Sequence, residues 1–216
     1  MIRKVGIIAA ALSLALSGAS AMAKVSDADA NKLGNELTPL GAMKAGNADG
    51  SIPAWTGGIT SAPAGYTVGD HHPDPYPEDK VLFEITAQNY KEYADFLSEG
   101  QKKLFEAYPE TFRMPVYPTR RSASNPQFIY DATKVNATSA ELLDGGNGIK
   151  GAVLGIPFPI PQNGLEAIWN HILRYRGEAV QRNGGQAAVT NGGDYNVIGF
   201  DEQLLIKYAE EGATPE

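Results

Sequence analysis

Residues 155–177 read GIPFPIPQNGLEAIWNHILRYRG, and this stretch decides more of the fold than any other in the chain. Its first part alternates prolines with apolar residues: Ile156, Pro157, Phe158, Pro159, Ile160 and Pro161. Proline fixes φ and has no backbone N–H, so this strip cannot form a helix or a central strand. We expect an extended edge or wall that presents apolar side chains without seeking strand partners.

A capped helix follows the proline strip. Asn163 is an N-cap residue with Glu166 three positions later, and Gly177 suits the position after the last turn. Apolar side chains recur at helical spacing: Leu165, Ile168, Trp169, Ile172 and Leu173. This pattern predicts an amphipathic helix over residues 163–176 that is docked by a buried apolar stripe.

The start of the chain indicates export. Arg3 and Lys4 precede a short apolar run, and Ala21-Met22-Ala23 has the small-x-small pattern of a signal peptidase site. The apolar run is too short to span a bilayer, so we expect no transmembrane anchor. The prediction is a signal peptide over residues 1–23, cleavage after Ala23, and a mature protein in the periplasm.

Composition excludes several kinds of site. The chain of 216 residues has no cysteine, which rules out disulfides, zinc–thiolate sites and cysteine nucleophiles. Its formal net charge of −7 becomes more negative when Arg3 and Lys4 are removed, which argues against a nucleic-acid partner. The length suits one domain with a core of its own.

The region 24–80 reads as an N-terminal helix followed by a long strap. Ser26 can cap a short helix over residues 26–37, and residues 38–80 are rich in glycine and proline. A loop of this length in a compact domain wraps the surface or binds a partner. Apolar anchors are expected in the strap at Ile52, Trp55, Ile59 and Tyr66.

The region 81–216 completes the same domain as an α+β arrangement. Helices are predicted over residues 86–97 and 99–108, and alternation from residue 111 places Phe112, Met114 and Val116 on one strand face. Further strands are predicted over residues 128–138, 178–182, 186–190, 195–200 and 202–209. The glycine-rich segments 144–148, 183–185 and 191–193 are predicted turns.

Catalytic and metal motifs are weak. His71 and His72 lie beside Asp70 and Asp74, but adjacent histidines in a proline-rich loop rarely converge on one ion, so we expect no metal. No serine lies in a G-x-S-x-G motif, and no phosphate-binding lysine follows the glycines at 145–148. We therefore expect no enzyme and no cofactor.

Four blocks, residues 37–58, 112–121, 143–148 and 155–177, carry a family resemblance. With them the chain resembles the N-terminal half of the domain of unknown function 1329 family, exported proteins similar to outer-membrane lipoprotein-sorting factors. The resemblance implies a curved antiparallel sheet, a half-open β-barrel with helices on its concave side, which is incomplete in this chain. It also implies lipidic cargo, work with a resistance-nodulation-division type exporter, and no established catalytic residue.

Candidate binding residues follow from this reading. Ile156, Phe158, Ile160 and Trp169 are the candidates for contact with an apolar cargo, although Phe158 and Trp169 also suit a core. An anionic head group could be bound by the residues near the end of the helix, His171, Arg174 and Tyr175, or by Arg120-Arg121.

Three functions remain open on the sequence. The first is a periplasmic carrier or chaperone for lipid or another apolar ligand. The second is an interaction module, without cargo, in which the strap around Trp55 docks on an outer-membrane or transporter partner. The third is an enzyme that acts on a cell-envelope polymer, which would require a polar, convergent site.

Overall fold

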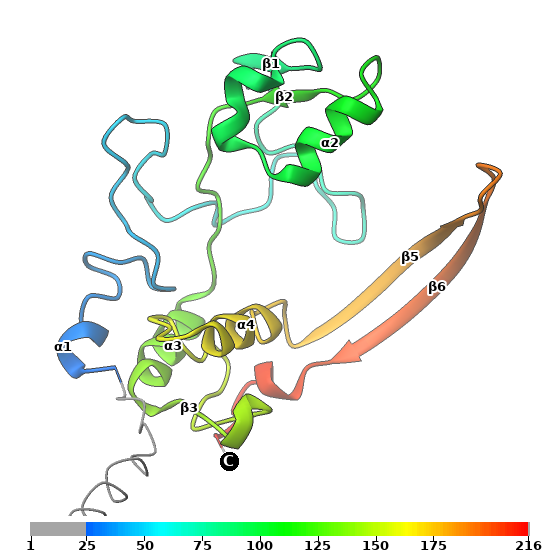
Figure 1. The fold of residues 1–216 in the computed structure, drawn as a ribbon. Coiled ribbons are helices and arrows are strands. Elements are labelled where there is room, and N and C mark those ends of the chain that lie inside the picture. The colour runs from blue at the N-terminus through cyan, green and yellow to red at the C-terminus, as the bar shows by residue number, and fades with distance from the viewer. Residues whose placement is uncertain (1–24, 216) are drawn as a thin grey trace, which may run out of the picture. The chain divides into compact units, whose positions relative to one another are not determined.

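The computed structural model describes residues 25–215, so the predicted signal peptide lies outside the described residues. The chain divides into two compact units (Figure 1). Among the described residues, the first unit contains residues 25–35, 39–41 and 126–215, and the second contains 36–38 and 42–125. The strands form three two-stranded antiparallel sheets, and none of these closes into a barrel. Mixed helices and small antiparallel sheets are thus confirmed as the fold class.

The second unit is built around one short sheet and two helical segments. Strand β1 (Phe83–Ile85) pairs with β2 (Met114–Val116), with Phe83 opposite Val116. Between them lie the 3₁₀ helix η1 (Tyr90–Phe96) and α2 (Glu99–Ala107). Helix α2 begins at a capping box between Ser98 and Gln101, and its predicted span is confirmed. The helix expected over residues 86–97 is confirmed only over residues 90–96, where it is a 3₁₀ helix, because Thr86 O accepts from Asn89 N–H and Tyr90 N–H in a turn that precedes it.

The core of the second unit is aromatic. Ile85, Leu97 and Phe105 are buried, and Phe105 lies between the rings of Tyr90 and Phe112. Partly buried side chains complete this core: Tyr90, Tyr93, Phe112, Met114 and Val116. The predicted inward face of residues 112–116 is therefore confirmed.

Among the described residues, the first unit contains the α-helices α1, α3 and α4 and two short 3₁₀ helices. Helix α1 (Asp27–Ala30) is capped by Ser26, but it ends well before the predicted residue 37 because the chain turns at residues 31–36. Helix α3 (Gln127–Ser139) replaces the strand predicted over residues 128–138. Strands β3 (Glu141–Leu142) and β4 (Ile149–Lys150) enclose the predicted turn, which contains the 3₁₀ helix η2 (Asp144–Gly146).

Helix α3 forms because its inward positions follow a helical period that includes polar residues. Ile129, Thr133, Asn136 and Ala137 are buried at spacings of four, three and one. Thr133 Oγ1 donates to Ile129 O over 2.7 Å, which satisfies a buried hydroxyl within the helix. The strand was predicted as a continuation of the pattern at residues 112–117, but burial on one helical face determines the structure of this segment.

Helix α4 (Gly164–Ile172) leads through the Gly177 turn into a long hairpin (Figure 1). Strand β5 (Ala179–Val189) pairs with β6 (Tyr195–Leu205), and the 3₁₀ helix η3 (Lys207–Ala209) follows. The turn predicted at residues 191–193 is confirmed by the strand pairing around it. The turn predicted at residues 183–185 is wrong, because β5 continues through Gly184 and Gly185. The four separate strands predicted over residues 178–209 are also wrong, because they form two continuous strands, β5 and β6.

The glycines of β5 make room for a side chain from the opposite strand. A Cβ atom on Gly184 would lie 2.7 Å from Cζ of Phe200, its cross-strand neighbour. The Arg182 guanidinium lies 5.4 Å from the centre of the same ring and pairs with Glu202. Phe200 therefore covers Gly184, and β5 continues past this glycine without a turn.

Among residues 25–215, no helix combines the length and apolar character that a membrane crossing requires.

Candidate functional site

The proline strip forms the centre of the first unit. Pro157 is fully buried, Phe158 is 7% exposed, and Ile156 and Ile160 are half-buried. Phe158 packs with Ala140 and Ala152, and Trp169 of α4 lies against this cluster. Of the two forms expected, an edge or a wall, the middle of the strip is an internal wall.

Two asparagine side chains take the place of strand partners for this wall. Asn170 on α4 donates to Phe158 O over 2.6 Å and accepts from Phe158 N–H over 2.8 Å. Asn136 on α3 donates to the carbonyls of Val153 and Ile156 and accepts from Val153 N–H. The extended backbone can be buried because these amides satisfy its polar groups.

Helix α4 turns a different face inward from the one that its sequence predicts. Asn163 is the N-cap as expected, but the helix ends at Ile172. Glu166 is buried, where its carboxylate accepts from Gln162 N–H over 2.6 Å and from Asn163 Nδ2–H over 3.1 Å. Trp169 is half-buried, and its Nε1–H donates to Gly146 O over 2.9 Å.

The apolar stripe of α4 is therefore largely uncovered. Leu165, Ile168 and Ile172 are 48%, 50% and 45% exposed, which contradicts the expectation of a fully buried stripe. These three residues, at i, i+3 and i+7, form the outward stripe of α4. A helix that binds its unit through Trp169 and Asn170 leaves this stripe free to contact another molecule.

The candidate head-group residues separate into two environments. Arg174 Nη1 donates to the carbonyl of His171 over 2.7 Å and lies 3.4 Å from His171 Nε2, and both side chains are exposed. Tyr175 is half-buried, and its ring meets that of Phe128 at 5.9 Å in an edge contact. The structure thus brings His171 and Arg174 together next to Ile172, while Tyr175 packs on α3.

Trp55 belongs to the second unit and anchors the strap. Its Nε1–H donates to Ala123 O over 3.0 Å, and Ile59 N–H donates to Ser122 O over 2.9 Å. Ile52 is exposed and is no anchor, contrary to expectation. Trp55 belongs to the second unit, and the apolar residues of α4 belong to the first.

Arg121 fixes the strap by its guanidinium. It donates to four backbone carbonyls, those of Met43, Lys44, Ala45 and Pro53, over 2.7–3.4 Å. Its neighbour Arg120 pairs with Asp79 and lies over the Tyr76 ring. That hydrogen bond lowers the pKa of the Asp79 carboxyl. Both arginines therefore have protein partners, which weakens their candidacy as head-group ligands.

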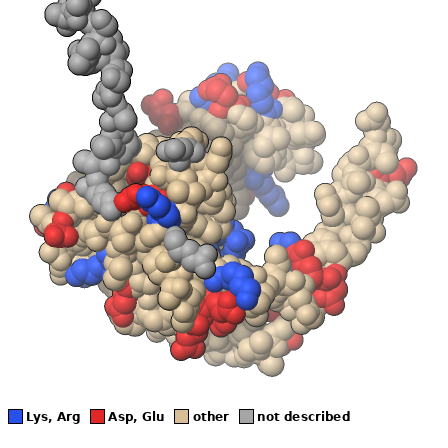
Figure 2. Space-filling model, turned by 90° about the horizontal axis from the view of Figure 1, so that it is seen from below, with Lys and Arg blue, Asp and Glu red and all other residues tan. Residues whose placement is uncertain are grey.

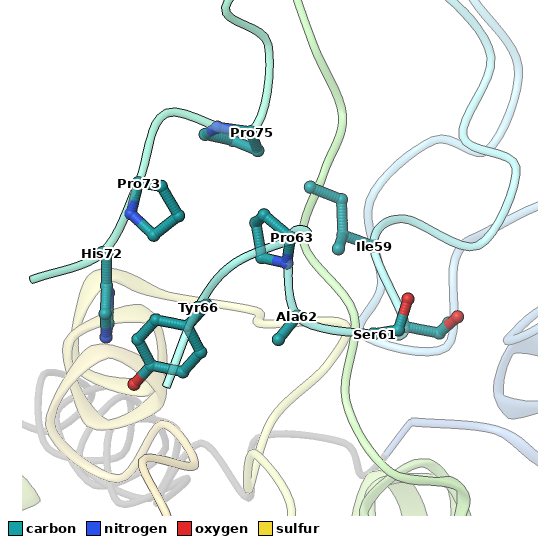
Figure 3. A pocket seen from close by; sticks show the side chains of 9 residues that line it. Ile59, Ser61, Ala62, Pro63, Tyr66, His72, Pro73 and Pro75 are labelled. Atoms are coloured by element: carbon teal, nitrogen blue, oxygen red, sulfur yellow. The ribbon is translucent and has the colours of Figure 1, made fainter. Parts of the chain in front are cut away.

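A pocket of about 490 Å³ lies within the strap (Figure 3). Its walls are apolar and rich in proline: Ile59, Thr60, Ser61, Ala62, Pro63, Tyr66, His72, Pro73 and Pro75. The rings of Tyr66 and His72 meet edge to face at 5.3 Å. No aspartate, glutamate, lysine or arginine lines it, so the pocket suits an uncharged, apolar group.

The histidines of the strap were weighed as metal ligands. Among residues 25–215, no group of three or more His, Cys, Asp or Glu side chains is placed to hold an ion. His72 instead packs on Tyr66.

Comparison with known proteins places the chain in a family. The model of a family described as protein of unknown function (DUF1329) matches residues 84–216. The chain belongs to the DUF1329 family. This DUF1329 chain is also 47% identical over 196 residues to an uncharacterized protein, PA3922, of Pseudomonas aeruginosa. That alignment covers 91% of the DUF1329 chain and 43% of the relative, so the chain spans less than half of the relative's length. No solved structure gives a significant match.

Three residues that sequence analysis missed hold in place the segments of the DUF1329 chain that carry the family resemblance. Asn136 and Asn170 hold the proline strip, and Arg121 joins the block 112–121 to the block 37–58. The sequence offered one signal for these contacts, an asparagine at an inward-facing helix position, as at 136 and 170. This signal points to a contact with the proline strip only if one expects a proline-rich segment to need side-chain hydrogen-bond partners.

Proposed function

We propose that the chain is a periplasmic carrier that holds a lipid or another apolar cargo. The observation that carries this proposal is the outward stripe of α4, Leu165, Ile168 and Ile172, on a helix that is already anchored by other residues. Large apolar side chains that are uncovered together mark contact surfaces for apolar ligands or partners. Burial of an acyl chain contributes about 0.8 kcal/mol per methylene.

The β5–β6 hairpin supports the same proposal. Most of its large apolar side chains are exposed: Val189, Tyr195, Val197, Ile198, Phe200, Leu204 and Leu205. The hairpin is a long, bent ribbon in Figure 1, and its outer part shows little charge on the face seen in Figure 2. A curved antiparallel sheet of this kind, continued into a half-open barrel with helices on its concave side, would give an acyl chain an apolar surface.

The cargo contacts in this proposal differ from those expected from the sequence. Phe158 is part of the core, and Trp169 bonds to Gly146, so both act by supporting α4. The residues proposed to touch cargo are Leu165, Ile168 and Ile172. His171 and Arg174 lie at the end of the same stripe, where two basic side chains suit an anionic head group.

The first experiment is mass spectrometry of an organic extract from the chain purified from periplasm. We expect a stoichiometric acyl lipid or similar molecule. The double variant Ile168→Asn/Ile172→Asn should lose this cargo and the binding of phenylnaphthylamine, while its far-UV circular dichroism stays unchanged. The matched control is Val135→Asn, which removes an exposed apolar side chain from α3 and should keep both. A folded chain whose extract is empty and whose probe binding equals that of the double variant would contradict the proposal.

The interaction module remains the second candidate, and the strap pocket is the observation that favours it. A pocket with proline-rich walls, lined also by Tyr66 and His72, suits an apolar side chain of an exporter or outer-membrane protein. Tyr66→Ala should then abolish partner capture by a periplasmic cross-link, and Ile168→Asn/Ile172→Asn should not. The reverse pattern, with loss of capture only in the α4 double variant, would assign the contact to the outward stripe.

A further inference from the structure

The backbone is strained at Leu154, just before the proline strip. Among residues 25–215, Leu154 alone of the residues other than glycine has a positive φ, +65°. A leucine rarely adopts this conformation, because its Cβ atom crowds the backbone. The N–H of Gly155 donates to the carbonyl of Val153 over 2.8 Å. A hydrogen bond across one residue of positive φ defines the rarer, strained form of γ-turn, so the chain stores strain here.

Two elements hold this γ-turn from opposite sides. From η3, Tyr208 O accepts from Leu154 N–H over 2.9 Å, and the Tyr208 hydroxyl donates to Gly155 O over 2.6 Å. From α3, the Asn136 amide bonds both polar groups of Val153. A strained residue persists only where its surroundings fix the backbone, and these hydrogen bonds do so at Leu154.

The γ-turn lies directly on α3. A Cβ atom on Gly155 would overlap Oγ1 of Thr133 and would lie 2.6 Å from its backbone nitrogen and 2.8 Å from Ile129 O. A backbone packed this closely cannot shift by small steps, because packed contacts change between discrete arrangements. The turn is therefore either held in its strained form or released.

The γ-turn also joins the base of the hairpin to α4. Helix η3 follows β6 after one residue, Ile206, whose N–H closes the hairpin on Glu178 O. The ring of Tyr208 packs against the buried cluster that contains Phe158. Phe158 is in turn bonded on both backbone polar groups by Asn170 of α4. A movement of η3 thus acts on the turn and on the proline strip together.

We propose that the γ-turn at Leu154 is a latch between the hairpin and α4. Withdrawal of Tyr208 lets Leu154 relax to a negative φ and separates the Phe158 backbone from Asn170 in the same event. Relief of the strain offsets part of the lost hydrogen bonding, which makes opening easier than unfolding of the unit. All of these residues belong to the first unit, so the latch needs no ligand. In the proposed carrier, a ligand on the hairpin would act on α4 through it, and this consequence alone rests on the proposed function.

The first test is amide hydrogen exchange of the chain without added ligand. Tyr208→Phe keeps the ring but removes the hydroxyl that bonds Gly155 O. Exchange should become about tenfold faster at both Leu154 and Phe158, because one opening exposes both amides. Exchange at Thr133, in the middle of α3, should change by less than about twofold, since α3 stays folded. An unchanged rate at Phe158, or an equal rise at all three amides, overturns the proposal.

The matched control for this variant is Tyr175→Phe. Tyr175 is also half-buried in the first unit, and its ring contacts Phe128. This variant should leave the exchange rates of Leu154 and Phe158 as they are in the wild type. Acceleration of both amides equal to that in Tyr208→Phe would contradict the latch.

The second test isolates the strain at residue 154. Leu154→Gly and Leu154→Ala both remove the leucine side chain, but only glycine adopts a positive φ without strain. The Phe158 amide should therefore exchange about tenfold more slowly in the glycine variant than in the alanine variant. At a residue without strain the order is reversed, because glycine gives the chain more freedom. Equal rates, or the reversed order, overturn the proposal and leave the carrier proposal untouched, since no ligand takes part.

Discussion

The side chain of Asn170 pairs with the backbone of Phe158 on both of its polar groups, through one donated and one accepted hydrogen bond. The amide thereby supplies what a neighbouring strand would supply to an extended segment. Prolines on both sides of Phe158 keep this segment out of a regular sheet. The burial of the proline strip therefore depends on a side chain from α4.

Replacement of Asn170 by alanine should destabilise the first unit by about 2–4 kcal/mol, because a buried N–H and a buried C=O lose their partners. Trp169 lies in this unit and Trp55 in the other, so urea unfolding followed by Trp169 fluorescence in a Trp55→Phe background measures the loss. Asn35→Ala is the control, because Asn35 makes one exposed hydrogen bond, to Asn31 O. It should cost less than about 0.5 kcal/mol. Equal losses in both variants would refute this role of Asn170.

Arg121→Lys should loosen the strap although it keeps the charge. A lysine ammonium cannot reach the four carbonyls that the planar guanidinium bonds at once. We expect faster proteolysis and faster hydrogen exchange over residues 43–55. Arg120→Lys is the matched control, because Arg120 bonds the carboxylate of Asp79 and none of the backbone carbonyls of residues 43–55 that Arg121 bonds. The prediction is wrong if the two variants are cleaved at the same rate.

Gly41 should tolerate alanine much less well than Gly34, and both glycines belong to the first unit. Both have positive φ, +94° and +83°, and an alanine there costs about 1–2 kcal/mol in backbone strain. A Cβ on Gly41 would in addition overlap the carbonyl oxygen of Pro159, whereas nothing lies within 4 Å of one on Gly34. The thermal midpoint, followed by Trp169 fluorescence in a Trp55→Phe background, should fall for both variants because both carry the backbone strain. It should fall clearly further for Gly41→Ala, and an equal fall in both would disprove the contact.

Tyr208 should make the first unit sensitive to alkali. Burial raises the pKa of its hydroxyl, which donates to Gly155 O over 2.6 Å. The raised pKa favours the protonated phenol in the folded state. Its contribution is therefore complete below the ordinary value of 10.0 and is lost as the pH rises above it, because the unfolded chain ionises first. The urea midpoint should fall more steeply above this pH for the wild type than for Tyr208→Phe, while the exposed Tyr117→Phe should follow the wild type.

Short sequence patterns correctly predicted the helices and strands that are stabilised by contacts within a few residues. The N-caps predicted at Ser26 and Asn163 are followed by helices, and each helix begins nearer to its predicted residue than it ends. Alternation at residues 112–116 gave the correct inward face of β2. These features depend on hydrogen bonds and burial within a few residues, which a sequence displays directly.

The failures occur where a distant residue decides the outcome. The glycines at 184 and 185 resemble a turn until β6 is placed beside them, with Phe200 over Gly184 and Val197 against Gly185. Residues 127–139 resemble a strand until Asn136 is seen to bond with Val153 and Ile156. Cross-strand and side-chain-to-backbone partners of this kind cannot be found by periodicity alone.

The candidate site shows the same division. The sequence identified α4 and its apolar stripe, but it could not say which side of the helix its unit would cover. The buried Glu166 and the paired Asn170 decide that orientation, since their hydrogen bonds need neighbours from residues 158–163. Polar residues, rather than the apolar ones, therefore determine which surface of α4 is left open.

The hairpin begins and ends at one place, because Ile206 N–H bonds to Glu178 O and Leu154 N–H bonds to Tyr208 O close behind it. These hydrogen bonds fix the base of the hairpin whatever the length of β5 and β6. Paired insertions or deletions of two residues in β5 and β6 would change its length and keep the alternation of faces. The length of the hairpin can therefore change in evolution while the rest of the first unit keeps its structure.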